Sequence, residues 1–312
     1  MLKQIKGLHH VTSLASSAQK NNAFFTDTLG LRRVKKTVNF DAPDVYHLYY
    51  GDAVGTPGSV MTYFPFPLAA RGKPGIGEVG TTAFSVPMGS LDAWGVRLGE
   101  RGVKGLARDT QFGTDQITFQ GPDGDAFALV ETETESTSPW TGNGIGEGMA
   151  ITGFHSAALR LDEAGATAEL LRFMGYEAAL KDGGRTRYVV PGGNAANVID
   201  IECVGPAADA KQGAGSVHHL AFAVENRARQ QEVREALIDT GYNVTPVIDR
   251  DYFHAIYFRT PGGVLFEIAT NEPGFCRDEE TARLGEALKL PPRYEYLRDR
   301  LERQLEPLDS AA

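Results

Sequence analysis

The stretch GLHHVTSLA at residues 7–15 has a close counterpart in SVHHLAFAV at residues 216–224, and this pair decides the fold. Each stretch carries two adjacent histidines and continues with small and bulky apolar residues in alternation, the pattern of a buried strand. Because self-similarity within a chain marks a repeated structural unit, the pair predicts that the chain is built from copies of one module.

Two more copies of the strand lie between these stretches, TTAFSVP at 81–87 and FHSAALRL at 154–161. Each of the four strands is followed by an amphipathic stretch that reaches a glycine, the residue that suits the left-handed position at the end of a helix. Further strands then follow a turn rich in proline and glycine. The pattern predicts four βαβββ modules, whose closing glycines lie 72, 73 and 66 residues apart: Gly30, Gly102, Gly175 and Gly241.

The domain boundary is expected at STSPWTGNGIGEG, a stretch rich in Gly, Ser and Thr between the second and third modules. The fold class is therefore α+β, with two domains of paired modules and a helical extension. In that extension Leu297, Leu301 and Leu305 form one helical stripe, typical of packing across the domains or against a second subunit, so a homo-oligomer stays open. The predicted parts are an N-terminal domain (1–135), a linker (136–150), a C-terminal domain (151–275) and a helical tail (276–312).

The composition indicates a globular protein that binds a small molecule. The 312 residues carry a net charge of −9 and no basic block, which argues against a nucleic-acid partner and against an anionic membrane surface. The start MLKQIKGLHH lacks the apolar core of a signal peptide, so a cytoplasmic location is expected. With two cysteines in the chain, any metal must be bound by histidine and carboxylate.

Strand alternation separates the two histidines of a pair, since adjacent side chains on a strand point to opposite faces. In the second pair, His218 shares a face with bulky Leu220 and Phe222, which should lie under the helix. His219 then faces a concavity together with small Ala221. At most one histidine of each pair is thus expected to reach a common centre.

A metal site follows when the other strands are added. In VLFEIAT at 264–270, Glu267 falls opposite the apolar face, where a buried carboxylate needs a partner. Alignment of the two pairs adds His10 to His219. Two imidazoles and one carboxylate leave the other coordination positions of a metal open, as in non-haem Fe(II) oxygenases, although Mn(II) accepts the same ligands. The equivalent cleft of modules two and three offers no such ligands, so one metal is expected; its residues are Ser156, Thr81 and Ala128.

The sequence resembles the vicinal oxygen chelate superfamily, and within it the ring-cleaving hydroquinone and chlorohydroquinone dioxygenases. The resemblance covers nearly the whole chain and implies Fe(II) bound by His10, His219 and Glu267, with an aromatic diol and dioxygen as substrates. The stretches that carry it are GLHHVTSLA, YHLYYGDAVGTPGSVMTYFP, GSVHHLAFAV, DRDYFHAIYFRTPGGVLFEIATNEPGF and LKLPPRYE.

The resemblance also implies roles around the metal. His218 and Tyr257 are the candidates for moving protons, and Arg250 is the cation that would hold the negative charge of the bound diol or of the oxygen. His9 and Thr12 are expected to bind the substrate.

Each of these assignments has a structural alternative. Tyr257 is equally typical of a packed aromatic residue, and Arg250 could pair with Asp249 or Asp251 on its own loop. A catalytic His218 requires a bulge or a twist at the strand end, because alternation turns it toward the helix. The remaining histidines are expected to be structural: His47, His155 and His254.

Two other functions stay open on the sequence alone, because one fold serves many activities. A non-redox isomerase or glyoxalase would use more carboxylate ligands than the single one found. A metal-free aromatic-binding or resistance protein would not need the set of two histidines and one glutamate.

Overall fold

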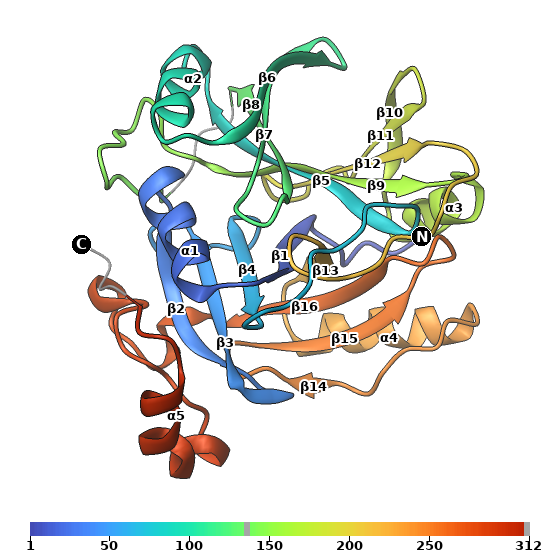
Figure 1. The fold of residues 1–312 in the computed structure, drawn as a ribbon. Coiled ribbons are helices and arrows are strands. Elements are labelled where there is room, and N and C mark those ends of the chain that lie inside the picture. The colour runs from blue at the N-terminus through green and yellow to red at the C-terminus, as the bar shows by residue number, and fades with distance from the viewer. Residues whose placement is uncertain (134–137, 309–312) are drawn as a thin grey trace.

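The computed structural model describes residues 1–133 and 138–308. Figure 1 shows two curled β-sheets, with short helices toward the two ends of the molecule and strands from both ends of the chain in one sheet. Each sheet has eight strands. The predicted α+β fold of paired βαβββ modules is confirmed.

The first sheet joins the first module to the fourth. Each of these modules contributes four strands, with its first and last strands parallel, and the two first strands pair antiparallel at the centre of the sheet. The strands in spatial order are β14 (Ile248–Asp249), β15 (Phe253–Arg259), β16 (Leu265–Pro273), β13 (Val217–Val224), β1 (Leu8–Ala15), β4 (Val60–Pro65), β3 (Ala42–Gly51) and β2 (Arg32–Asn39).

The second sheet joins the second module to the third in the same way. Here too the first strands of the two modules pair antiparallel, and each runs parallel to the last strand of its own module. The strands in spatial order are β10 (Glu177–Asp182), β11 (Arg185–Val189), β12 (Val198–Cys203), β9 (Gly153–Leu161), β5 (Glu78–Pro87), β8 (Ala126–Thr132), β7 (Thr114–Gln120) and β6 (Lys104–Gln111).

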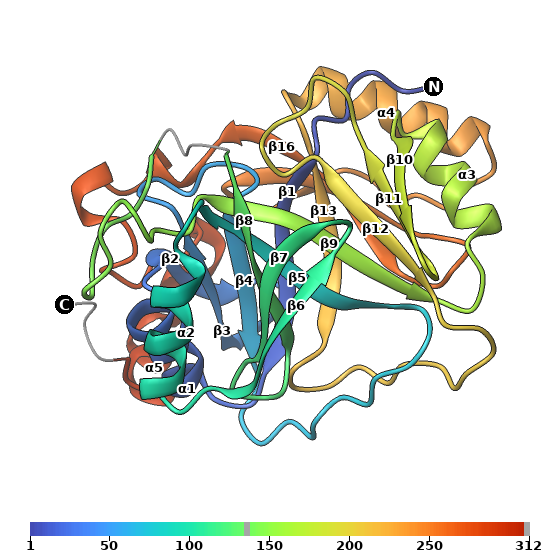
Figure 2. The ribbon, with the colours of Figure 1, turned by 90° about the horizontal axis from the view of Figure 1, so that it is seen from above.

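One helix follows the first strand of each module. All four predicted closing glycines have positive φ, between 66° and 96°, which confirms that a residue without Cβ ends each helical segment. In Figures 1 and 2, the helices of modules one and two lie at one end of the molecule, and those of modules three and four lie at the other. They are α1 (Ala18–Ala23), extended by the π-helix η1 (Phe24–Thr28), α2 (Leu91–Glu100), α3 (Gly165–Phe173) and α4 (Arg227–Asp239).

The expected boundary over 136–150 falls between β8 and β9, two strands of the second sheet. Its first two residues, like residues 309–312 of the predicted tail, lie outside the part of the chain that the structure describes. None of the helices in the described ranges is both long and apolar enough to cross a membrane.

The tail after β16 packs against the first module. The Tyr294 hydroxyl donates to the Phe40 carbonyl at 2.6 Å, and Leu301 is fully buried in the main core. The predicted leucine stripe therefore packs within the chain. The helical elements of the tail are η2 (Phe275–Arg277), η3 (Thr281–Arg283), η4 (Pro292–Leu297) and α5 (Arg298–Gln304).

Candidate metal centre

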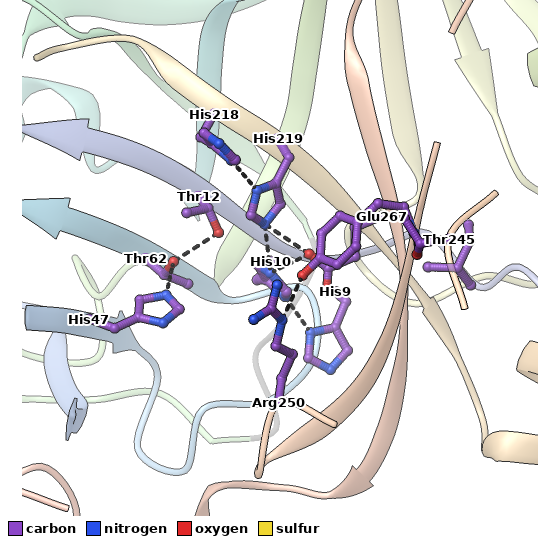
Figure 3. Close-up of polar contacts among 12 residues, drawn as sticks. His9, His10, Thr12, His47, Thr62, His218, His219, Thr245, Arg250 and Glu267 are labelled. Carbon is purple, nitrogen blue, oxygen red and sulfur yellow. Dashed lines mark hydrogen bonds and ion pairs between the residues drawn. The ribbon is translucent and has the colours of Figure 1, made fainter. Parts of the chain in front are cut away.

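The two His-His pairs meet at the centre of the first sheet. Strands β1 and β13 pair antiparallel there, which brings His10 and His219 together although they are 209 residues apart in sequence. Strand β16 runs parallel to β13, with Glu267 beside Ala221, so the carboxylate projects toward the same point (Figure 3). The structure thus brings together the three residues that the sequence predicts as metal ligands.

The distances suit a metal ion bound on one face. Glu267 Oε2 lies 2.8 Å from His219 Nε2 and 3.5 Å from His10 Nε2, and the two nitrogens are 3.4 Å apart. Ligand atoms of an ion that forms bonds of about 2.1 Å at right angles lie about 3.0 Å apart. The three atoms therefore fit one triangular face of an octahedron, with the opposite face open to other ligands.

The protonation states also fit a cation. Glu267 is fully buried, and neither of its oxygens accepts a hydrogen bond of good geometry from the described residues. Burial alone would raise the pKa of Glu267, but the His10 and His219 imidazoles beside it hold that pKa well below its usual range. Burial lowers the pKa of His219, which favours the neutral imidazole that a metal requires. An ionised carboxylate buried beside two imidazole nitrogens is the environment that a divalent cation would complete.

The predicted orientation of His218 is wrong, because each His-His pair contains a β-bulge. In the pairing of β1 with β13, His219 lies opposite Thr12, but the next pair is Val217 with Ser13, so His218 is an extra residue. An extra residue breaks the alternation of side chains along the strand. His218 consequently faces the cavity and not helix α4.

His9 occupies the equivalent extra position in β1. As a result, both histidines of each pair touch through the same atoms: His9 Nδ1 is 2.9 Å from His10 Nδ1, and His218 Nδ1 is 2.7 Å from His219 Nδ1. Since the Nε2 atoms of His10 and His219 face Glu267, their protons belong on Nδ1 when a metal is bound. His9 and His218 then accept these protons in hydrogen bonds, the usual support of a metal-bound histidine.

A cavity of about 300 Å³ opens in front of the three residues. A void of about 150 Å³ is enough to hold benzene, so this cavity accommodates one substituted aromatic ring. Its walls combine apolar and aromatic side chains with a few polar groups, as is typical of a small-molecule site. The apolar and aromatic lining residues are Leu14, Phe40, Phe64, Phe66, Phe253 and Leu265.

Arg250 and Tyr257 line the cavity together. Arg250 Nε donates to the Tyr257 hydroxyl at 3.2 Å, and Arg250 Nη1 donates to Asp41 at 2.9 Å. The alternative expected from the sequence, an ion pair of Arg250 with Asp249 or Asp251, is therefore wrong, because the partner of Arg250 comes from the first module. Burial and Glu267 raise the pKa of Tyr257 well above its usual value, so this hydroxyl keeps its proton.

The two residues expected to bind substrate lie behind the cavity wall. His9 is buried beside Phe253 and lines a separate hollow of about 250 Å³, not the main cavity. The Thr12 hydroxyl is buried 2.9 Å from the Thr62 hydroxyl. Both residues therefore support groups that face the cavity.

His47 and Tyr49 are polar cavity residues to which the sequence reasoning gave no role. From the sequence, His47 in VYHLYY is expected to be a cross-strand or core residue. The signal that could have found it is positional: Tyr49 lies opposite Thr62 in the first module, as Tyr257 lies opposite Glu267 in the fourth.

Among the described residues of the second sheet, no equivalent cluster of metal-binding side chains is found. Thr81 and Ser156 occupy the positions of the two metal-binding histidines, as predicted. Because the sheet is nearly symmetric, two of its residues correspond to Glu267: Ala128, as predicted, and Asp200, a carboxylate that the sequence analysis did not include. Arg187 donates to both oxygens of Asp200, at 2.8 and 2.9 Å, so this carboxylate is engaged in an ion pair. Within the described ranges, one cluster of three metal-binding side chains is found.

The sequence matches the glyoxalase/bleomycin resistance protein/dioxygenase superfamily twice, over residues 7–129 and 125–268. The chain belongs to this superfamily. The two matches correspond to the two pairs of modules, and they confirm the resemblance to the vicinal oxygen chelate superfamily.

Members of the superfamily with named activities are similar along the whole chain. MhqO of Bacillus subtilis (strain 168), named as a proposed ring-cleaving dioxygenase, is 40% identical over 99% of this chain and 98% of its own length. The chlorohydroquinone/hydroquinone 1,2-dioxygenase of Sphingobium indicum is 36% identical over 97% of each chain. A crystal structure of a proposed dioxygenase from Bacillus subtilis superposes with a TM-score of 0.95, at 40% identity over 98% of each chain.

Proposed function

We propose that this protein is an Fe(II)-dependent ring-cleaving dioxygenase that inserts both atoms of dioxygen into a hydroquinone or a substituted hydroquinone. The observation that carries the proposal is the facial set of His10, His219 and Glu267 at the base of an aromatic-lined cavity. Such a set leaves positions open for the diol and for oxygen on the same ion. The similarity to a chlorohydroquinone/hydroquinone 1,2-dioxygenase over the whole chain supports the substrate class.

Bound Fe(II) would supply the redox chemistry that joins an electron-rich diol to dioxygen, and Mn(II) is the alternative ion for the same ligands. The residues around it have separate tasks. Glu267 and the two neutral imidazoles leave one positive charge on a divalent ion, which favours binding of the diol as an anion. The Arg250 guanidinium, which keeps its proton in proteins, adds a second positive charge at the cavity wall.

Proton movement is assigned to His218 and Tyr257. With its Nδ1 engaged by His219, His218 carries its proton on Nε2 and can donate it toward the cavity. Burial lowers the pKa of His218 to about 4, so its neutral form prevails near pH 7 and acts as a hydrogen-bond donor. Tyr257 is a second neutral donor, oriented by Arg250. The aromatic walls exclude water and align the ring with the open metal positions.

A glyoxalase-type isomerase is the alternative within the superfamily. Further carboxylate ligands would favour it, and Asp41, the other carboxylate of the cavity wall, is occupied by Arg250 at 2.9 Å. A metal-free binding protein would not need an ionised carboxylate buried between two imidazoles, which is costly without a cation.

Anaerobic reconstitution followed by oxygen uptake tests the proposal. Apo-protein is loaded with Fe(II) or Mn(II) and mixed with hydroquinone, chlorohydroquinone, catechol or methylglyoxal with glutathione. Uptake of one dioxygen per diol with an acyclic product supports the proposal. Turnover of the glutathione adduct without oxygen uptake supports the isomerase, and failure of either ion to bind supports the metal-free protein.

A further inference from the structure

One wall of the cavity has no role in the proposed reaction. It is formed by His47 and Tyr49 on β3, with Thr62 of the adjacent strand β4 behind them. The Tyr49 hydroxyl lies 2.8 Å from His47 Nδ1, and His47 Nε2 lies 2.8 Å from Thr62 Oγ1. The chain of hydrogen bonds ends at Thr12, and all four side chains are buried.

The symmetry of the sheet relates this wall to the metal-binding wall. In the fourth module, Tyr257 lies opposite Glu267, and in the first module Tyr49 lies opposite Thr62. Because β1 and β13 are the central strands, the two tyrosines occupy equivalent positions on opposite wings of the curled sheet. Figure 3 shows His47 and Thr62 across the metal-binding histidines from Glu267. In the half of the sheet formed by the first module, Thr62 therefore places a hydroxyl at the position that the Glu267 carboxylate occupies in the half formed by the fourth module.

The two wings differ in charge. The fourth-module wing carries the Glu267 carboxylate and the Arg250 guanidinium. On the first-module wing, burial raises the pKa of Tyr49 well above its usual value and lowers the pKa of His47 well below its own. The Tyr49 and His47 side chains are consequently neutral hydrogen-bonding groups, suited to a neutral hydroxyl.

A para-diol presents two oxygens to two different surroundings. Its ring is rigid, so when one oxygen occupies a metal position the other must lie away from the ion, whereas the two adjacent oxygens of an ortho-diol can share one metal. We infer that Tyr49, held in place by His47, binds the second hydroxyl of a para-diol and thereby selects para-diols. The inference rests on the proposed function for its substrate class.

The hydrogen-bonding inventory supports this role. Both nitrogens of His47 are already used, by Thr62 and by Tyr49, so His47 is a positioning residue. A tyrosine hydroxyl has one proton and can also accept hydrogen bonds. When Tyr49 donates to His47 Nδ1, its oxygen is left to accept a hydrogen bond from the diol in the cavity.

Paired ligands test the contact without turnover. Affinities of hydroquinone and phenol, which differ by one hydroxyl, are measured by anaerobic calorimetry on the metal-loaded protein. A neutral hydrogen bond contributes about 0.5–1.5 kcal/mol, so the parent should prefer hydroquinone by about 2- to 12-fold beyond the roughly twofold statistical advantage of its two equivalent hydroxyls. In Tyr49→Phe the ratio should fall to about that statistical factor of two, with phenol affinity unchanged. His47→Leu should lower the same ratio, and His47→Gln, which keeps an acceptor for the hydroxyl, should restore part of it.

Tyr50→Phe is the matched control. Tyr50 is the next residue of β3, it stacks on Phe25 with ring centroids 4.9 Å apart, and its buried hydroxyl has no partner among the described residues. The ratio should stay at the parental value in this variant. An unchanged ratio in Tyr49→Phe, or an equal loss in Tyr50→Phe, would overturn the inference.

Oxygen uptake by the same parent protein separates the two proposals. Uptake with hydroquinone but no change of the ratio in Tyr49→Phe leaves the proposed function standing and refutes the role of Tyr49. A ratio that falls as expected, in a parent that consumes no oxygen with any diol, supports the contact and refutes the dioxygenase.

Discussion

Replacement of His9 by leucine should weaken metal binding without removing a ligand. The His9 ring is buried at 3% exposure, and its Nδ1 lies 2.9 Å from His10 Nδ1. The backbone of Thr270 accepts a hydrogen bond from the other side of the ring. His9 is thus fixed on both sides and holds the proton-bearing nitrogen of His10 in place.

The magnitude follows from the group left behind. In His9→Leu the N–H of the metal-bound His10 has lost its acceptor in a buried position, which costs about 1–3 kcal/mol. Loss of the partner of a metal-bound histidine typically lowers metal affinity by about 10- to 100-fold. We therefore expect the dissociation constant for Fe(II) or Mn(II) to rise by that factor in His9→Leu, and binding to be lost in His10→Leu.

Chelator competition under anaerobic conditions at pH 7 measures both constants, and thermal unfolding of the apo-proteins shows that the variants fold. His155→Leu is the matched control, because His155 is the extra residue of β9 in the second sheet, as His9 is the extra residue of β1 in the first. It lies 3.2 Å from Ser156 Oγ, and the described residues around it form no metal-binding cluster. Parental affinity in His9→Leu would refute the assigned hydrogen bond. A complete loss of metal binding, equal to that of His10→Leu, would indicate that His9 is itself a ligand and that the register assigned to β1 is wrong.

Three further outcomes follow from the structure. Thr81→Ala combined with Ser156→Ala should leave one metal per chain, and a parental value near two that falls in this variant would contradict the single site. Burial raises the pKa of Asp125 to about 6, so Asp125→Asn should stabilise the protein by up to about 3 kcal/mol at pH 8 but not at pH 4, measured by denaturant unfolding; equal effects at both pH values would be contrary evidence. Burial lowers the pKa of His9 to about 3 and that of His218 to about 4, from 6.5. Between pH 6.5 and 4 the unfolded chain therefore binds protons that the folded chain excludes, and the free energy of unfolding of the apo-protein should fall as pH is lowered through this window; a flat profile would disprove the assignment.

The modules were predictable because their signals are local. A glycine with positive φ closes each helix, and the alternation along Leu220 and Phe222 is fixed by the helix that covers them. Glu267 was found for the same reason: a lone carboxylate within a buried apolar strand stands out in sequence. These features depend on residues a few positions apart.

The bulges at His9 and His218 were not predictable, because a bulge depends on the partner strand. The strands β1 and β13 lie about two hundred residues apart in the chain, and nothing within either stretch shows where one strand carries an extra residue relative to its partner. For this reason alternation gave the wrong face for His218. The polar wing around His47 was missed for a related reason, since its bonds join residues of different strands.

Metal content of four proteins tests the central claim most directly. The parent, His10→Ala, His219→Ala and Glu267→Gln are reconstituted anaerobically with Fe(II), desalted and analysed by plasma emission spectroscopy, with circular dichroism to confirm folding. The geometry predicts about one iron per chain in the parent and almost none in any variant, because each removes one of three ligand atoms. Iron retained at the parental level in a folded Glu267→Gln protein would contradict the proposed metal centre.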